Sequence, residues 1–264
     1  MPLHAIRPHP LRRRLAPAPP CFKRLRLPLA LFLLLLTTGL LRAESASAPA
    51  GSLSPRGGRV GWARLVSDDP EWRRHTRSDH ELSGYIKTRT SLNLDPAWHT
   101  ADPARPDELT RYPLIFSTGL STFQDETRRK NLGEYLNRGG FLIVDACINK
   151  DVTPNPDVFL TGNTAVFQAI LPGSNVKPLP PDHAIYACFF TLPEKPPHTY
   201  HNAIFDPRWS RHPLYGVFAD SGRLAAVISL SGLQCGWDRM PGPSGHTEQC
   251  MQMVVNIYVH AMTR

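Results

Sequence analysis

Two reactive side chains stand at the end of an apolar run in "LNRGGFLIVDAC", residues 136–147. The run 141–146 predicts a buried strand, which places Asp145 and Cys147 at its carboxyl end. In an open α/β sheet, ligands bind and catalysis takes place at that end. A carboxylate in such a position must be hydrogen-bonded, paired with a charge or bound to a ligand. Asp145 is therefore a candidate ligand for a metal or a polar molecule, and Cys147 is a candidate nucleophile.

A catalytic Cys147 requires a sharp strand-to-helix turn, a thiolate and an adjacent base. The flanking sequence "DACINK" has no glycine, although small neighbours relieve the strain of such a turn. Asp145, two residues earlier, would raise the pKa of the thiol. His183 can serve as the base only if its loop folds back over the strand end. These features favour a structural cysteine and argue against a Cys-His-Glu amidotransferase.

Asp182 and His183 form a second pair of polar side chains, in a predicted loop. Together with Asp145 they are candidate ligands for an oxygen-preferring divalent metal or a polar molecule. The alternatives are structural: Asp145 would cap the backbone amides of the next segment, and Asp182 with His183 would stabilise their own loop. Apart from this candidate divalent metal, no cofactor is predicted.

Further candidates follow other predicted strands. Thr118 and Gly119 end an apolar run and either line the same crevice or simply form a turn. Trp237 is a candidate ligand platform, with a lid over the core as the alternative. Cys235 and Cys250 bracket a Gly/Pro-rich loop and are the predicted disulfide pair, because an exported protein meets an oxidising compartment. Two buried thiols are the alternative.

Hydrophobic periodicity predicts the elements that position these residues. Apolar or alternating runs predict strands over 58–66, 91–98, 112–119 and 141–146, and a hairpin over 214–231. Helical spacing predicts helices over 79–90, 122–139, 163–173 and 245–264. Thr122 and Asp125 have capping-box spacing, and 180–190 reads as a loop running into a strand. The predicted fold class is α/β, a three-layer sandwich with a largely parallel sheet and an antiparallel C-terminal extension.

The first 43 residues have the order of a secretory signal, with basic residues, an apolar run at 27–41 and then small residues. A membrane span needs about 20 apolar residues, so cleavage is expected and an uncleaved anchor is the alternative. The Ser/Ala/Pro/Gly-rich stretch 44–59 predicts a disordered linker. Residues 60–264 predict a single α/β domain with a substantial core.

The net charge of +8 belongs to the N-terminal segment. Residues 1–43 hold eight Lys and Arg and no acid, and the remaining 22 basic residues balance the 22 acidic ones. The domain therefore lacks the excess of positive charge that is typical of nucleic-acid binding, and we expect no nucleic-acid partner.

Five segments in a fixed order carry a family resemblance. They are "YPLIFSTG", "LGEYLNRGGFLIVDA", "LPPDHAIYACFF", "GRLAAVISLSGLQCGW" and "VVNIYVHA". Together they resemble the domain of unknown function 4159 family, which is similar to class I glutamine amidotransferase-like and ThuA-like proteins. The resemblance implies a flavodoxin-like (glutamine amidotransferase-like) fold over 60–264 and an envelope-associated bacterial protein, and it implies no established activity.

The family pattern maps onto this chain with three differences. The family often has paired acids where this chain has Asp145 followed by Ala146. It often has an Asp-His-Pro triplet where this chain has Asp182, His183 and then alanine. Its Gly-Cys-Gly-Trp turn is present with Gln234 in the first place.

The combined interpretation is an exported protein, periplasmic or secreted, whose domain binds an unknown small molecule or another envelope protein without catalysis. The alternative is a hydrolase of the amidotransferase or ThuA-like type, or a metal-dependent enzyme, with a site around Asp145, Asp182 and His183. Contact with the membrane is expected only if 27–41 stays uncleaved as an inner-membrane anchor.

Overall fold

The structure is a computed structural model that describes residues 59–68, 70–147, 155–197, 209, 212–239 and 244–263. These residues belong to one compact unit, Leu53–Arg264. The predicted signal segment, its apolar run at 27–41 and the linker up to residue 58 lie outside the described residues. Within the described ranges, no helix is both long enough and apolar enough to cross a membrane.

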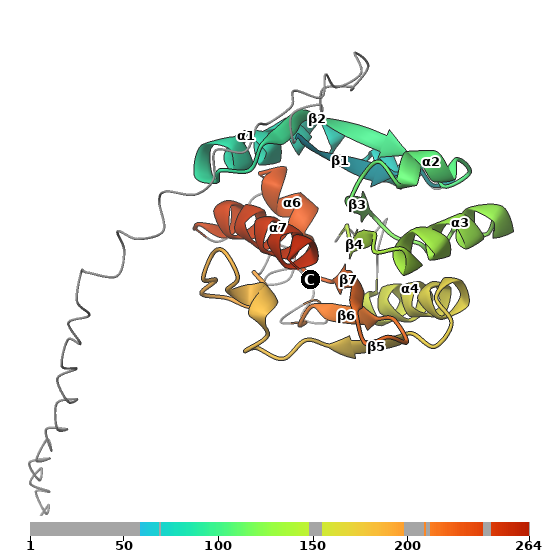
Figure 1. Ribbon diagram of the computed structural model, residues 1–264. Coiled ribbons are helices and arrows are strands. Elements are labelled where there is room, and N and C mark those ends of the chain that lie inside the picture. The colour runs from blue at the N-terminus through green and yellow to red at the C-terminus, as the bar shows by residue number, and fades with distance from the viewer. Residues whose placement is uncertain are drawn as a thin grey trace, which may run out of the picture. The chain divides into compact units, whose positions relative to one another are not determined.

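A seven-stranded sheet forms the centre of the unit, in the order β2-β1-β3-β4-β7-β6-β5 (Figure 1). The strands β2, β1, β3, β4 and β7 run parallel, whereas β6 and β5 pair antiparallel. The predicted parallel sheet with an antiparallel extension is therefore confirmed. The bounds are β1 Val60–Leu65, β2 Leu94–Ala101, β3 Leu114–Ser117, β4 Phe141–Asp145, β5 Asn175–Pro178, β6 Tyr215–Phe218 and β7 Leu224–Ser229.

The strands β3, β4 and β7 are buried along their whole lengths. Strands that are covered on both faces carry continuous apolar runs rather than alternating ones, as "FLIVD" and "LAAVIS" do. Asp145 of β4 pairs in register with Ser229 of β7. The carboxyl ends of these two strands are therefore level, and the segments that follow them leave the sheet next to each other.

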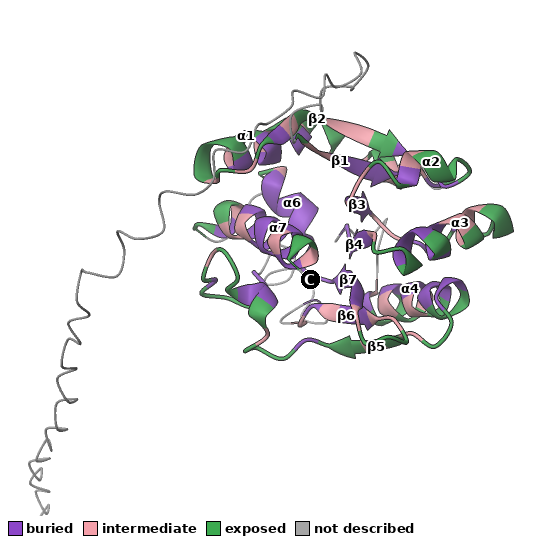
Figure 2. Ribbon diagram, viewed as in Figure 1, coloured by how far each residue is buried: buried purple, intermediate pink, exposed green. Residues whose placement is uncertain are grey.

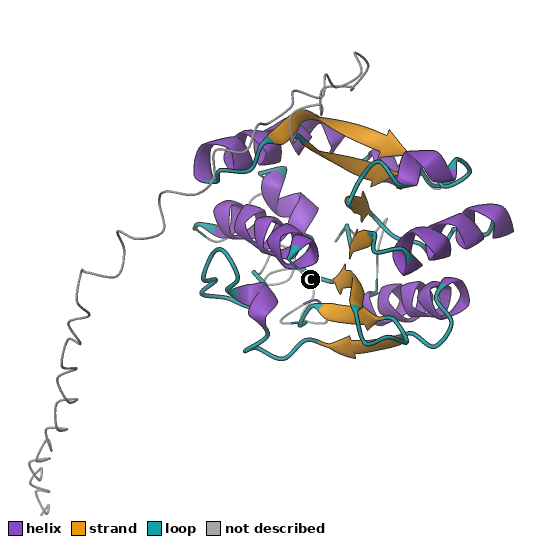
Figure 3. Cartoon of the chain, in the orientation of Figure 1, coloured by secondary structure: helices purple, strands orange, loops and turns teal. Residues whose placement is uncertain are grey.

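Helices cover both faces of the sheet, which makes the domain a three-layer α/β structure (Figure 3). The helices α2, α3 and α4 pack apolar side chains into one core, and α1, α6 and α7 pack into the other. Their buried sides face the sheet (Figure 2). The bounds are α1 Asp79–Arg89, α2 Pro106–Leu109, α3 Glu126–Asn137, α4 Pro156–Ile170, α6 Leu233–Trp237 and α7 His246–Met262.

The helices α3 and α4 approach each other closely at Gly133. A Cβ at this position would overlap the carbonyl oxygen of Ile170, so the contact requires glycine. The N-cap of α3 is Asp125, whose carboxylate accepts a backbone N–H of the first turn at 2.7 Å. The predicted helix start at Thr122 is therefore about one turn too early. The predicted stop is confirmed, since Gly139 takes a left-handed conformation directly after the helix, with φ of 104°.

Three other predicted boundaries differ from the structure. The stretch 180–190 contains the 3-10 turn η4 (Ala184–Tyr186) and no strand. The strand in this region is β5, and its sequence "NVKP" is too exposed for an apolar run to mark it. The helix α4 starts about two turns before residue 163, where Asn155 caps it and Pro156 takes the first helical position. The short helix α6 has no counterpart among the predicted elements.

Candidate functional site

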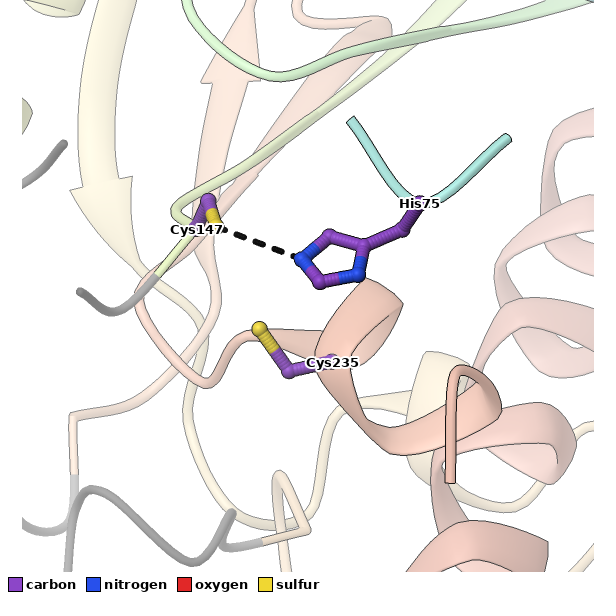
Figure 4. A group of neighbouring side chains, drawn as sticks. All are labelled: His75, Cys147 and Cys235. Atoms are coloured by element: carbon purple, nitrogen blue, oxygen red, sulfur yellow. Dashed lines mark hydrogen bonds between the residues drawn. The ribbon is translucent and has the colours of Figure 1, made fainter. Parts of the chain in front are cut away.

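A cluster of two thiols and one imidazole lies where the chain leaves β1, β4 and β7 (Figure 4). Its members are His75, Cys147 and Cys235. The sulfur of Cys147 lies 3.7 Å from Nε2 of His75. One nitrogen or sulfur atom of each residue lies within 4.8 Å of those of the other two. We call these three residues the His-Cys-Cys cluster.

Each member of the cluster lies on a different segment. His75 stands between the 3-10 turns η2 (Pro70–Arg73) and η3 (Thr76–Ser78), which follow β1. Cys147 lies directly beyond the end of β4, and Cys235 lies in α6, which follows β7. The carboxyl ends of parallel strands meet at one edge of a sheet, so residues far apart in the sequence converge there.

The imidazole of His75 is held on its other side by Asp238. Nδ1 of His75 contacts Oδ2 of Asp238, and Oδ1 of Asp238 accepts a hydrogen bond from the hydroxyl of Ser78. A carboxylate, an imidazole and a thiol therefore stand in line, from Asp238 through His75 to Cys147. The carboxylate favours a proton on Nδ1 and leaves Nε2 to face the sulfur.

The backbone of His75 adopts a left-handed conformation, with φ of 60° and ψ of 14°. Residues with a side chain take this conformation rarely, and such strain concentrates at functional sites. Among the described residues, the other non-glycine position with positive φ is Arg239, directly after Asp238. One strained position therefore lies in the line of side chains that ends at Cys147, and the other directly follows the first member of that line.

Asp145 holds the helix that carries Cys235. Its carboxylate accepts the backbone N–H groups of Leu233 at 3.0 Å and of Gln234 at 2.9 Å, at the start of α6. Asp145 is buried, and this burial raises the pKa of its carboxyl to about 7 in spite of these hydrogen bonds. The structure thus places Asp145 as a cap on the amides of another segment.

The side chain of Gln234 ties three segments together. Its Nε2 donates to the carbonyl oxygen of Arg74, the residue before His75, at 2.7 Å. Its Oε1 accepts a hydrogen bond from Nη1 of Arg64 in β1 at 3.3 Å. Arg64 is itself buried and forms an ion pair with Asp79 at 2.5 Å. Gln234 therefore fixes the segment that carries His75 against α6.

The cluster shifts the titration of its own members. The hydrogen bond from Cys235 lowers the pKa of Cys147 to about 5, and the contributions of His75 and Arg74 help this lowering outweigh burial. Burial disfavours the charged form of His75, but Cys147 and Asp238 together raise the pKa of the ring above its ordinary value. Both shifts favour a thiolate beside an imidazolium at neutral pH.

Two kinds of chemistry suit this arrangement. A thiolate next to an imidazolium that a carboxylate orients is the arrangement of a cysteine nucleophile with its base. Two thiolates and an imidazole are also a ligand set that soft transition ions such as Zn²⁺ prefer.

Asp182 and His183 lie in another part of the domain. They follow β5, and the ring of His183 lies 5.2 Å from the ring of His260 near the end of α7. Asp145 lies close enough to Cys250, near the start of α7, to affect its titration. Burial is the larger cause of the raised pKa of the Cys250 thiol, and the negative charge of Asp145 is the second. Cys250 and His260 are about 15 Å apart along the helix axis. Asp145 is buried against the start of α6 and Asp182 is exposed before η4, so a site shared by Asp145, Asp182 and His183 stays a prediction.

Thr118, Gly119 and Trp237 have structural surroundings. Thr118 and Gly119 form the turn after β3, in which the hydroxyl of Ser117 donates to the Gly119 carbonyl and accepts from its N–H. Trp237 is 0% exposed, with its ring centroid 5.2 Å from that of Phe116. A ring without an exposed face cannot stack on a ligand. The prediction of a ligand platform at Trp237 is therefore replaced by a core position.

Cys235 and Cys250 are not joined by a disulfide, contrary to the predicted pairing. The sulfur of Cys250 lies against Gly236, where a Cβ would overlap it. The sulfur of Cys235 faces Cys147 and His75 instead (Figure 4). Consecutive residues of a helix point about 100° apart. The turn of α6 therefore directs residue 235 into the cluster and residue 236 toward α7.

Sequence patterns did not reveal His75 and Asp238 as members of the site. His75 lies in a polar stretch without periodicity, and Asp238 follows a helix of five residues. The usable signal is topological, because polar residues after any parallel strand reach the same edge as Cys147.

Comparison with known proteins places the domain in a family. No curated protein matches the chain. The profile of the family described as "Domain of unknown function (DUF4159)" matches residues 62–262, a range that includes the whole His-Cys-Cys cluster and Asp238. The match confirms the resemblance carried by the five sequence segments. The chain therefore belongs to the DUF4159 family.

Proposed function

We propose that this domain is a cysteine-dependent hydrolase of small amides or esters. Cys147 is the nucleophile, His75 is the general base and acid, and Asp238 orients His75. The observation that carries the proposal is the line of contacts from Oδ2 of Asp238 to Nδ1 of His75, and from Nε2 to the sulfur at 3.7 Å. A nucleophile, a base within reach and a third group that orients the base are what such a site requires.

The reaction proceeds in two steps through a thioester. In the first step the thiolate of Cys147 attacks the carbonyl carbon, the bond to the leaving group breaks, and the imidazolium of His75 gives its proton to the leaving amine or alkoxide. In the second step His75 takes a proton from water, the hydroxide attacks the thioester carbon, and the carbon–sulfur bond breaks. The products are a carboxylic acid and the original thiolate–imidazolium pair.

The surroundings of the sulfur support a small substrate. Cys147 is 3% exposed, whereas the side chains of His75 and Asp238 keep 15% and 20% of their surface in solvent. The more exposed His75 and Asp238 support an approach of the substrate to the sulfur past the imidazole. The positive charge of Arg74, the residue before His75, also favours the thiolate.

The flavodoxin-like assignment and export to the cell envelope are further parts of the proposal. The order β2-β1-β3-β4 is that of flavodoxin-like sheets, with β7 in the place of their fifth strand, which supports the fold assignment. The basic, apolar and small-residue order of residues 1–43 supports export.

Acylation by p-nitrophenyl acetate tests the hydrolase. The wild-type protein, kept reduced, is expected to release p-nitrophenolate and to carry an acetyl group on Cys147, detected by mass spectrometry. Cys147→Ser should abolish the adduct, and His75→Gln should slow its formation by about 100-fold or more. Cys188→Ser is the matched control, because Cys188 is exposed and outside the cluster.

A domain that only binds an envelope partner gives a different result in this assay. In that case, wild-type and Cys147→Ser proteins release p-nitrophenolate at the same rate, and no acetyl group appears on Cys147. That outcome would overturn the hydrolase and leave a non-catalytic binding module.

A further inference from the structure

The His-Cys-Cys cluster contains one more sulfur than the proposed hydrolysis needs. Cys235 belongs to neither the nucleophile nor the base, yet its sulfur stands with Cys147 and His75 within 4.8 Å (Figure 4). The Cys147 sulfur and the His75 Nε2 are 3.7 Å apart. In a tetrahedral zinc site with bonds of about 2.3 Å to sulfur and about 2.05 Å to nitrogen, these atoms lie about 3.6 Å apart. This pair of donor atoms already has that spacing.

We propose that Nε2 of His75 and the sulfurs of Cys147 and Cys235 bind a single Zn²⁺ ion, which blocks Cys147. The metal site stands on the cluster geometry alone. The blocking rests on the proposed function, because a thiolate that donates an electron pair to zinc is a weaker nucleophile toward a carbonyl carbon. Three protein ligands leave the fourth tetrahedral position to water or another small ligand.

The donor atoms select a soft ion over Mg²⁺ or Ca²⁺. Thiolate sulfur and imidazole nitrogen suit zinc, whereas Mg²⁺ and Ca²⁺ require oxygen ligands. Two thiolates also neutralise the charge of the divalent ion, so the complex places no net charge in a buried position. Zinc binds thiolates and a neutral imidazole, so its binding releases the protons that these ligands carry.

Asp238 completes the arrangement from outside the ligand set. Histidine ligands of zinc usually donate their other ring N–H to a carboxylate or a carbonyl, which fixes the tautomer and the ring orientation. Nδ1 of His75 contacts Oδ2 of Asp238, so Nε2 is left to bind the ion. The contact between His75 and Asp238 therefore orients the imidazole both as a general base and as a zinc ligand.

Cys235, the third proposed ligand, is held in place by hydrogen bonds at the start of α6. Asp145 accepts the N–H groups of Leu233 and Gln234, and Gln234 donates to the carbonyl oxygen next to His75. Cys235 follows directly on these fixed residues. The three donor atoms are therefore positioned before an ion arrives, which lowers the entropic cost of binding.

Zinc binding to the reduced, metal-free protein tests the site directly. A titration against a chromophoric chelator is expected to give one Zn²⁺ per chain, and Co²⁺ in its place should give thiolate-to-cobalt absorption bands. Cys235→Ser retains a hydrogen-bond donor to Cys147 but lacks the soft ligand, so its affinity should fall by about 100-fold or more. Cys188→Ser should bind like the wild type.

The outcomes separate this inference from the proposed function. No zinc binding, or equal affinity in wild-type and Cys235→Ser proteins, would overturn the metal site, whatever the p-nitrophenyl acetate assay gives. One tight zinc per chain without any acetyl-Cys147 in the metal-free protein supports the site and overturns the hydrolase. If both hold, stoichiometric zinc should suppress acetylation of Cys147 in the wild type, and continued acetylation would refute the blocking.

Discussion

The pH at which Cys147 becomes reactive is the most direct measure of what the cluster does to its thiol. An ordinary cysteine has a pKa of about 8.5, whereas the hydrogen bond from Cys235 and the contact with His75 lower that of Cys147 to about 5. The difference corresponds to about 5 kcal/mol in favour of the thiolate. We expect the alkylation rate of Cys147 to rise with a midpoint near pH 5, and His75→Gln to move that midpoint up by about one pH unit or more.

The magnitude decides which pH to use. At pH 7 an ordinary thiol is about 3% ionised, so Cys147 has about a 30-fold larger thiolate fraction. Its lower basicity reduces the nucleophilicity of each thiolate by about 40-fold, with a Brønsted slope of 0.4–0.5. The two effects nearly cancel at pH 7. At pH 5.5 Cys147 should react about 20-fold faster than a free thiol, by the same two relations.

The assay is alkylation by iodoacetamide in the Cys188→Ser background, which removes the exposed thiol. Trypsin separates Cys147 and Cys235 into different peptides, 139–150 and 224–239, so mass spectrometry follows each thiol alone. N-acetylcysteine gives the reference profile. The sign follows from the lowered pKa of the thiol, since the reactive thiolate is present above pH 5 and is lost as the pH falls through that value.

Three results would refute this reasoning. A wild-type midpoint at or above pH 8 would show that the cluster does not stabilise the thiolate. A midpoint that stays the same in His75→Gln would show that the imidazole does not act on Cys147. Reaction that occurs only after unfolding in urea would exclude Cys147 as a nucleophile in the native protein.

Three further predictions concern the groups around the site and the packing of the helices. Asp238→Asn should slow the acylation of Cys147 by about 10-fold or more, because an amide does not fix the tautomer of the His75 imidazole as the carboxylate does. An unchanged rate of acylation would show that Asp238 does not orient His75. Asp145→Ala should lower the free energy of unfolding in urea by about 2–5 kcal/mol, since two buried N–H groups lose their acceptor; a loss below about 1 kcal/mol contradicts the capping role. Gly133→Ala should destabilise the protein by about 3 kcal/mol or more, which is the upper end of the cost of over-packing. The control is Gly84→Ala at an exposed helix position with open space around the new Cβ, which should stabilise the protein by about 0.5–1 kcal/mol. A Gly133→Ala protein more stable than Gly84→Ala would contradict the described packing.

The central sheet was predictable because burial on both faces leaves a clear record in the sequence. "FLIVD" and the hairpin around residue 221 are marked by apolar runs and a glycine turn, and both match the structure. The edge strand β5 was missed, since an exposed strand has no need of apolar side chains. The start of α3 was placed to within about a turn, because Thr122 and Asp125 are both acceptable caps, whereas the start of α4 was placed about two turns too late.

The site was predictable only in its location. Cys147 and Asp145 were found because they end a strand, but their roles depend on groups that arrive from distant segments. Asp145 near the thiol was expected to raise the pKa of Cys147, yet its carboxylate is engaged by the amides of α6, and the donor from Cys235 outweighs it. No local spacing connects residues 75, 147 and 238, so only the three-dimensional topology unites them.

The His-Cys-Cys cluster is assembled from three segments that are far apart in the sequence and are therefore synthesised one well after another. Until α6 has docked on Asp145, Cys147 lacks the donor from Cys235, and His75 lacks the carboxylate of Asp238. A growing chain therefore carries a thiol of ordinary basicity, and the lowered pKa of Cys147 arises only in the finished domain. The order of the sequence therefore keeps this thiol at ordinary basicity until the segment that follows β7 is in place.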